Sequence, residues 1–249
     1  MDIGLAVGAL MWSPAFAALI TCALFKIKIS TLGWNFYPIR YECIAYLLPL
    51  LYSLPVYLAV WLTISDVFEL NAFMKTQSIT YGIPNAPHFA TWFVAIPLIM
   101  TIGVIRSLAL TLGEEIGWRG FLFPRLNTRF GFTKACFLSG IIWAMWHYLG
   151  ILYLGYGGAT PKVEAFICFT ITVIALSFIL GYIRLKTNSI WPCAILHASH
   201  NIIIQAIFNP MTSQTGKATL IVGEFGIGLV LTTSVLAIWF WHKETVDKN

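Results

Sequence analysis

Apolar residues occur in this chain as long continuous runs rather than in alternation with polar ones. Each run approaches the roughly 20 residues that an α-helix needs to cross a bilayer. A strand of a membrane barrel needs only about 10 residues and alternates in polarity. The pattern therefore predicts an all-α transmembrane bundle of about seven spans, or eight with a re-entrant or interfacial helix. The predicted spans are Ile3–Phe25, Ile44–Ile64, Phe89–Leu112, Ala135–Leu154, Val163–Tyr182, Ile190–Phe208 and Ala218–Trp241.

The composition limits the classes of protein to which the chain can belong. Of its 249 residues, 59% are hydrophobic and only 10% are charged, and the mean hydropathy is +0.81. A soluble domain carries roughly 25% charged residues. A soluble enzyme, a nucleic-acid-binding protein and a disordered protein are therefore disfavoured, and the expected partner is the lipid bilayer. The five cysteines show no CxxC spacing and are expected to be small buried side chains.

The basic residues divide unequally between the two sides that the predicted spans define. One side receives only Lys75, Lys162 and Lys217, and Arg106 falls within a span. The opposite side collects the others: Lys26, Lys28, Arg40, Arg119, Arg125, Arg129, Lys134, Arg184, Lys186, Lys243 and Lys248. Because positively charged loops favour the cytoplasm, we expect the N-terminus outside and the C-terminus in the cytoplasm.

A single integral membrane domain is expected over residues 1–249. Within it, residues 1–112 hold the N-terminal spans, residues 113–208 form the core, and residues 209–249 form the last span and a cytoplasmic tail. Tryptophans near span ends usually sit at the membrane interface. That role is expected for Trp34, Trp118, Trp191, Trp239 and Trp241.

Charged residues at the end of the third span need a partner or a function, because a charge at the bilayer centre costs about 2.5–3.5 kcal/mol. Arg119 follows Glu115 by four residues, the favourable order for an ion pair on one helical face. Glu114 then points about 100° away, towards the interior. A carboxyl group in such a place can serve in general acid–base catalysis. The alternative is an acidic pair with a purely structural role.

Two later spans also carry polar residues. His197 and Asn201 are four residues apart on one helical face, where they can stabilise an oxyanion or simply join two helices. His147, one turn after Trp143, is on its own typical of a core histidine. What favours chemistry is the coincidence of a carboxylate pair with two intramembrane histidines on three spans. Together they are the parts needed to activate water and stabilise a tetrahedral intermediate.

Two isolated charges lie within other predicted spans. Arg106 and Glu224 are assigned structural roles, with a pairing between them as one option, and His200 is given no role.

These motifs resemble the CAAX-protease and bacteriocin-processing (CPBP, or Abi) family of intramembrane proteases, which includes the Ras-converting CAAX endopeptidases. The family often has Phe where Trp143 stands, which is a conservative departure. The spans before the motifs match only in hydrophobicity. The resemblance rests on Glu-Glu-x-x-x-Arg at Glu114, Glu115 and Arg119, aromatic-x-x-x-His at Trp143 and His147, and His-x-x-x-Asn at His197 and Asn201.

The resemblance implies peptide-bond hydrolysis in a bacterial plasma membrane, with residues 113–208 as the catalytic core and the site facing the cytoplasm. The substrate would be a membrane-associated peptide or protein with a hydrophobic or lipidated segment, such as a CAAX-type tail or a leader peptide. The implied roles are a general base on water for Glu114 with His147, an oxyanion site for His197 and Asn201, and support by Glu115, Arg119 and Trp143.

The resemblance leaves the need for a metal open, since the family is described both as metalloproteases and as metal-independent glutamate proteases. The chain has no HExxH motif, which would place a zinc site on one helix. Glu114, His147 and His197 could hold zinc with an open position for water, or activate water without it. We expect no cofactor, with zinc as the alternative.

Two functions of other classes compete with proteolysis. A proton-coupled transporter also uses intramembrane carboxylates and histidines, although the chain shows none of the internal symmetry typical of transporters. A non-catalytic immunity or scaffold protein would bind another membrane protein, and the complete set of motifs argues against it.

Overall fold

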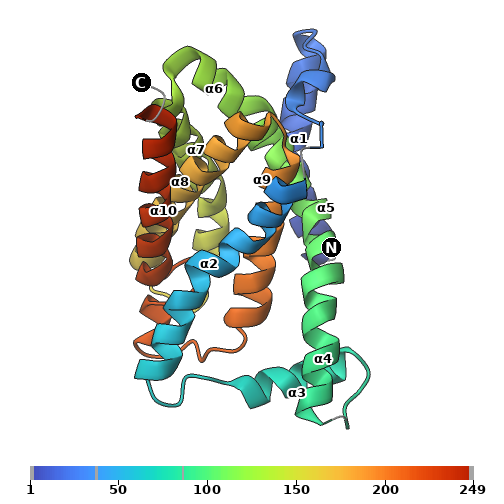
Figure 1. The fold of residues 1–249 in the computed structure, drawn as a ribbon, viewed down its shortest axis with the longest axis vertical. Coiled ribbons are helices and arrows are strands. Elements are labelled where there is room, and N and C mark those ends of the chain that lie inside the picture. The colour runs from blue at the N-terminus through green and yellow to red at the C-terminus, as the bar shows by residue number, and fades with distance from the viewer. Residues whose placement is uncertain (1–2, 37–38, 86, 247–249) are drawn as a thin grey trace.

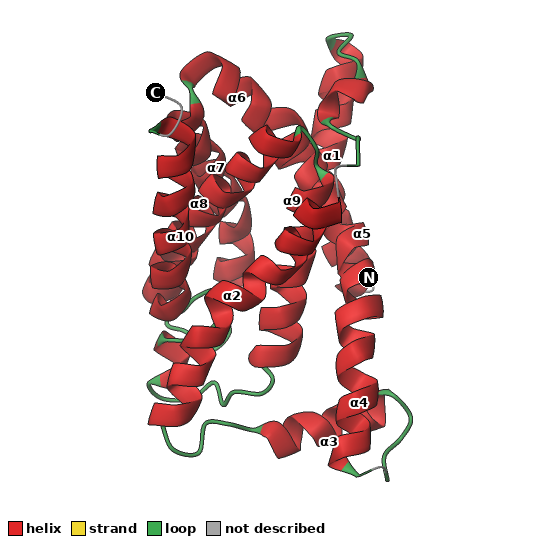
Figure 2. Cartoon of the chain, viewed as in Figure 1, coloured by secondary structure: helices red, strands yellow, loops and turns green. Residues whose placement is uncertain are grey.

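The computed structural model describes residues 3–36, 39–85 and 87–246, and in these ranges the chain is mostly helical (Figure 2). The ranges contain no β-strand, and their only strand-like pairing is a single bridge between Phe68 and Thr212. The prediction of an all-α bundle is confirmed.

Five described helical stretches are long and apolar enough to cross a membrane. Each overlaps one of the first five predicted spans. The count of seven stays a prediction, because the two C-terminal helical stretches do not meet the same criteria of length and hydropathy. The five are α1 (Ile3–Leu24), α2 (Ile39–Thr63), the continuous stretch 88–130, α7 (Phe132–Tyr153) and α8 (Lys162–Thr187).

The stretch 88–130 is a single helix of varying pitch along one side of the molecule, and it bends across the end of the bundle (Figure 1). It consists of α4 (His88–Leu98), the π-helical η2 (Ile99–Gly103), α5 (Val104–Glu115), the π-helical η3 (Ile116–Leu122) and α6 (Phe123–Phe130). Gly131, with φ of 78°, ends it. The predicted span stopped at Leu112 because polar residues interrupt the apolar pattern there, although the helix continues through them.

The C-terminal part differs from the prediction in where its last helix begins. The helix α9 (Trp191–His200) continues into the π-helical η4 (Asn201–Phe208), as the predicted sixth span requires. However, α10 (Ile227–Thr245) begins at Ile227 rather than at Ala218. The short 3-10 helix η5 (Ala218–Leu220) and a turn with Gly223 at φ of 76° precede it. Glu224 therefore lies in a turn and not within a span.

Two short helices accompany the long ones. The 3-10 helix η1 (Ile29–Leu32) follows α1, and α3 (Leu70–Thr80) packs against α4 at the end of the molecule opposite α6 (Figure 1). With 11 residues, α3 is too short to cross a bilayer.

The long helices pack in two groups. In the first, α8 lies between α7 and α10; in the second, α9 lies between α2 and α5, and α1 covers α5 (Figure 1). A large hydrophobic core extends through both groups. The three predicted motifs thus come from α5 with η3, from α7, and from α9 with η4.

Two glycines beside the carboxylate pair allow α1 to approach closely. A Cβ atom on Gly113 would lie 2.8 Å from the Trp12 side chain, and one on Gly117 would lie 2.5 Å from Pro14 Cβ. Real Cβ atoms essentially never come this near to another heavy atom, so both positions require glycine. Small residues spaced four apart are a common contact surface between membrane helices.

Gly117→Ala is expected to destabilise the fold by about 1–3 kcal/mol, as overpacking of a close interface does. The expected result is a lower thermal midpoint in detergent and a smaller folded yield. Gly8→Ala is the matched control, because it lies at the same α1–α5 interface and its new Cβ would be 3.7 Å from Leu110, an ordinary contact. Equal stability of the two variants would contradict this account of the packing.

Candidate active site

Glu114 is the last but one residue of α5 and is only 1% exposed. Its Oε2 accepts hydrogen bonds from Trp143 Nε1 at 2.9 Å and from Trp118 Nε1 at 3.4 Å. Among the described residues none hydrogen-bonds to Oε1, so this oxygen can bind an external donor. The prediction that Trp118 anchors the chain at the membrane interface is wrong, since its indole is buried against this carboxylate.

Glu115 forms the predicted ion pair with Arg119 at 3.0 Å, and both residues are almost fully buried. The Arg119 guanidinium also donates to Ser177 Oγ on α8 at 3.2 Å and lies over the Trp143 ring, 4.2 Å from its centroid. Because Glu115 makes this pair, its carboxylate is structurally distinct from that of Glu114, as the helical spacing predicts.

A second basic residue supports the same segment from α8. Arg184 was predicted in a cytoplasmic loop, but it is buried within the last turn of α8. Its Nε donates to the Arg119 backbone oxygen at 2.9 Å, and its Nη1 donates to Asn188 Oδ1 at 2.7 Å. No sequence signal indicated this role, because a basic residue near a span end usually marks the cytoplasmic surface.

His197 is bound to Glu115, a contact that the spacing of the motifs did not reveal. Its Nδ1 lies 3.0 Å from Glu115 Oε1, the oxygen that also pairs with Arg119. Since a carboxylate accepts, Nδ1–H donates, and Nε2 is left for another partner. Asn201 is half-buried at the start of η4, one turn after His197, and no described residue hydrogen-bonds to its side chain.

His147 is held by its own helix and by aromatic rings. Its Nδ1 lies 3.0 Å from the Trp143 backbone oxygen, which can only accept, so Nδ1 carries the proton and Nε2 has the free lone pair when the ring is neutral. Trp146 contacts the ring edge-on with centroids 4.6 Å apart, and Phe169 lies at 4.9 Å. The hydrogen bond to the Trp143 carbonyl fixes the tautomer, and the rings fix the plane of the imidazole.

Trp143 connects all three motifs. Its indole donates to Glu114, lies under Arg119, and contacts the His197 ring in a T-shape with centroids 5.2 Å apart. His147 follows it on α7, with ring centroids 6.1 Å apart. The structure thus brings the predicted residues Glu114, His147 and His197 around one side chain.

Glu224 has other partners than the one considered from the sequence. It pairs with His200 at 2.9 Å rather than with Arg106, which is exposed on α5. Tyr156, in the loop between α7 and α8, donates to Glu224 Oε2 at 2.9 Å. Burial, together with the charge of Glu224, raises the pKa of the Tyr156 hydroxyl, which stays a neutral donor. The signal that could have found this cluster is the carboxylate itself, in a glycine-rich apolar segment.

The side chains do not form the three-ligand set that the zinc alternative requires. In the described part of the chain, no three His, Cys, Asp or Glu residues are grouped as the ligands of one metal ion would be. We therefore derive no step through a metal.

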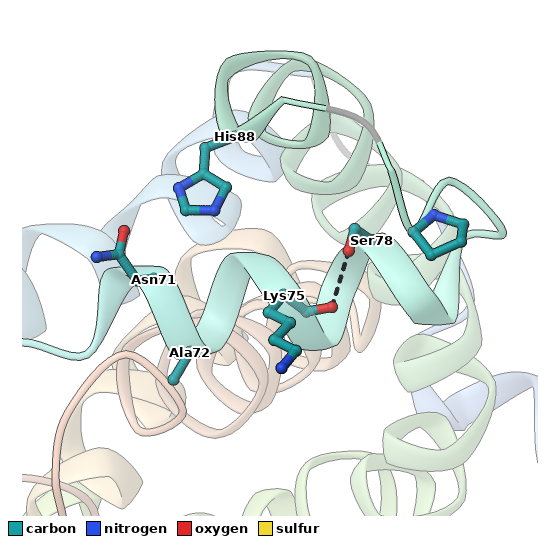
Figure 3. Close-up of a pocket in the computed structure, with 6 residues that line it drawn as sticks. Asn71, Ala72, Lys75, Ser78 and His88 are labelled. Atoms are coloured by element: carbon teal, nitrogen blue, oxygen red, sulfur yellow. Dashed lines mark hydrogen bonds between the residues drawn. The ribbon is translucent and has the colours of Figure 1, made fainter.

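The cavity between α3 and α4 is not part of this site. It has a volume of about 380 Å³ and is lined by Asn71, Lys75, Ser78 and His88 among others (Figure 3). None of the motif residues lines it, and it lies at the end of the molecule opposite α6 (Figure 1).

Comparison with known proteins gives two matches. Residues 89–203 match the family described as type II CAAX prenyl endopeptidase Rce1-like, and this range contains all three motifs. The chain is also similar to CAAX prenyl protease 2 of Methanococcus maripaludis, with 40% identity over 97 residues. That alignment covers 34% of this chain and 33% of the other protein, so the chain matches about a third of its relative's length.

Proposed function

From the match of residues 89–203 to the Rce1-like family of type II CAAX prenyl endopeptidases, we propose that the chain is a membrane endopeptidase. It would hydrolyse a peptide bond in a membrane-associated substrate that carries a hydrophobic or lipidated segment. The observation that carries the proposal is the arrangement around Trp143. A buried carboxylate and two histidines, which come from three helices, each contact this side chain.

In the proposed reaction, Glu114 is the general base. Its Oε2 is fixed by Trp143, while Oε1 accepts a hydrogen bond from the attacking water. His147 assists through Nε2, the nitrogen whose lone pair the bond from Nδ1 to the Trp143 carbonyl leaves free. The water proton passes to Glu114, the resulting hydroxide attacks the carbonyl carbon, and the proton is then delivered to the leaving amine.

His197 and Asn201 stabilise the oxyanion of the tetrahedral intermediate in this mechanism. Since His197 Nδ1–H is donated to Glu115, the ring offers a second N–H at Nε2 only as an imidazolium. Glu115 balances that positive charge. The carboxamide of Asn201, one turn further along the helix, supplies a second donor. Glu115 thus serves both Arg119 and His197.

The family match supports the proposed class of substrate, and the loop charges support the proposed orientation. A prenylated or otherwise hydrophobic C-terminal tail is the substrate class that the family name supports. The excess of basic residues near α6, α8 and the C-terminus supports an active site that faces the cytoplasm.

The test is cleavage of a membrane-tethered peptide by the purified protein in liposomes. The peptide carries a farnesylated CAAX tail and a fluorophore–quencher pair across the scissile bond. A second preparation with a pH-sensitive dye inside the liposomes reports proton transport. Peptide cleavage without proton flux supports the proposal. Proton flux without cleavage supports the transporter, and neither activity supports the scaffold.

Chelation addresses the metal requirement directly. Because the described side chains do not form a metal-ligand set, we expect turnover to be unchanged after treatment with 1,10-phenanthroline and removal of the chelator. Elemental analysis of the active protein is the accompanying measurement. One equivalent of zinc that is lost together with activity, and that restores activity when added back, would contradict this expectation.

A further inference from the structure

A second cluster of buried polar groups lies beside the proposed active site. Its centre is Glu224, which is 6% exposed. Glu224 Oε1 accepts from His200 Nε2 and from Gln205 Nε2, both at 2.9 Å, and Oε2 accepts from the Tyr156 hydroxyl at 2.9 Å. The Tyr52 hydroxyl on α2 lies 2.5 Å from His200 Nδ1. Both carboxylate oxygens of Glu224 and both ring nitrogens of His200 therefore have partners.

The cluster reaches the active site through the ring of Tyr156. This ring stacks on the imidazole of His147, with centroids 5.7 Å apart and planes inclined by 22°. Among the described rings around His147, it is the one whose flat face meets the imidazole nearly in parallel, since Trp146 and Phe169 meet it at steeper angles. The hydroxyl at the far end of the ring is the group that Glu224 holds.

The position of the cluster matters because the two motif histidines come from helices that do not pack along one another. His147 is on α7, which packs on α8 and α6, whereas His197 is on α9, which packs on α2 and α5. His200 lies one turn after His197 on α9. Glu224 therefore bridges α9 to the loop that follows α7, and Tyr156 carries that bridge to the His147 ring.

A buried ionic cluster is a costly way to hold two segments together. Well-packed apolar residues of similar volume are often as stabilising as a buried ion pair, or more so. What directed hydrogen bonds add is a fixed geometry. A misplacement of about 1 Å in a reacting group can cost on the order of 100-fold in rate.

We propose that Tyr156 is a positioning residue for His147. We further propose that Glu224, through its bond to His200, fixes the position of Tyr156 relative to α9, the helix that carries His197. The proposal rests on the proposed function, because positioning of His147 has a consequence for rate only if His147 takes part in the reaction. Tyr156 itself need not touch the substrate.

Two substitutions at Tyr156 separate the stacking ring from its hydroxyl. Tyr156→Leu removes the stack, and we expect kcat for the tethered peptide to fall about 10- to 100-fold with KM nearly unchanged. Tyr156→Phe keeps the ring and loses only the bond to Glu224, so the loss of kcat should be smaller. The matched control is Tyr148→Phe, the next residue on α7 after His147. Its hydroxyl bonds Thr170 at 2.8 Å, and its ring packs on Phe166.

A merely structural role predicts a different outcome. The Tyr148 and Tyr156 variants would then lose stability to similar extents, and kcat per folded molecule would be alike in all of them. That result would overturn the proposal, as would a loss in Tyr156→Leu that appears in KM alone.

A measurement without substrate keeps this inference separable from the proposed function. In protein labelled with ¹⁵N-histidine, the His147 signals are identified by their absence from His147→Asn. We expect them to shift or broaden in Tyr156→Leu and to stay in place in Tyr148→Phe. Unchanged His147 signals in folded Tyr156→Leu would overturn the positioning role. If the unmodified chain cleaves no peptide while the His147 signals respond as expected, the proposed function fails and the positioning stands.

Discussion

Glu114→Gln is expected to reduce peptide cleavage by roughly 100- to 10,000-fold, the range typical of losing a general base. The amide keeps the size of the side chain and one oxygen that can accept from Trp143 Nε1, but it has no useful basicity. Stability should change little, because Glu114 is not the counter-charge of Arg119. The measurement is turnover per folded molecule, with the folded fraction taken from size-exclusion chromatography and thermal unfolding in detergent.

The matched control for that variant is Glu164→Gln, the same substitution at an exposed position in the first turn of α8. It should leave turnover and stability as they are. Full cleavage activity in Glu114→Gln would show that Glu114 is not the general base and would rule out the mechanism proposed here.

Glu115→Gln is expected to act chiefly on folding. Arg119 is 1% exposed, and loss of its charged partner in such a place costs about 3–5 kcal/mol of stability. Turnover per folded molecule should also fall, but less than in Glu114→Gln, because the amide oxygen of the substituted side chain can still accept from His197 Nδ1. The measurements are the thermal midpoint, the folded yield and turnover corrected for that yield.

A double-mutant cycle with Arg119→Gln shows whether the loss comes from the ion pair. Because the second substitution removes the unpaired charge, the double variant should be destabilised by less than the sum of the two single changes. Strict additivity would mean that the two side chains act independently. A Glu115 variant that folds normally yet loses more activity than Glu114→Gln would exchange the roles of the two carboxylates.

The sequence predicted the parts of the fold that hydrophobic runs determine. The first five runs became helices because each is apolar over the length of a bilayer, and the i, i+4 spacing of Glu115 and Arg119 became the expected ion pair. The predicted helix boundaries were wrong where the hydrophobic pattern and the helix do not end at the same residue. The third helix continues through Glu114 and Arg119, because these residues are satisfied inside the protein rather than by water. The last helix starts late, because Gly223 turns the chain before it.

For the candidate site, the sequence named the residues but not their contacts. Spacing along one helix shows which side chains share a face, whereas the bond between His197 and Glu115 joins residues on separate helices. That bond forms because α9 packs against α5, and the sequence pattern of either helix alone does not predict it. The same holds for Trp118, which would be an interface anchor by its place in the sequence but turns inward to Glu114.

The helix that begins at His88 determines the depth of Glu114. At 1.5 Å per residue, the 26 steps from His88 to Glu114 amount to about 39 Å along the axis, whereas the hydrocarbon layer of a bilayer is about 30 Å thick. If His88 lies at one membrane surface and the helix runs along the bilayer normal, the carboxyl group lies beyond the hydrocarbon layer, level with the lipid headgroups of the other surface. The proposed hydrolysis would then draw its water from the adjacent aqueous phase and would need no channel through lipid. A substrate held in the hydrocarbon layer would then have to move towards the membrane surface until its scissile bond reaches the headgroup level.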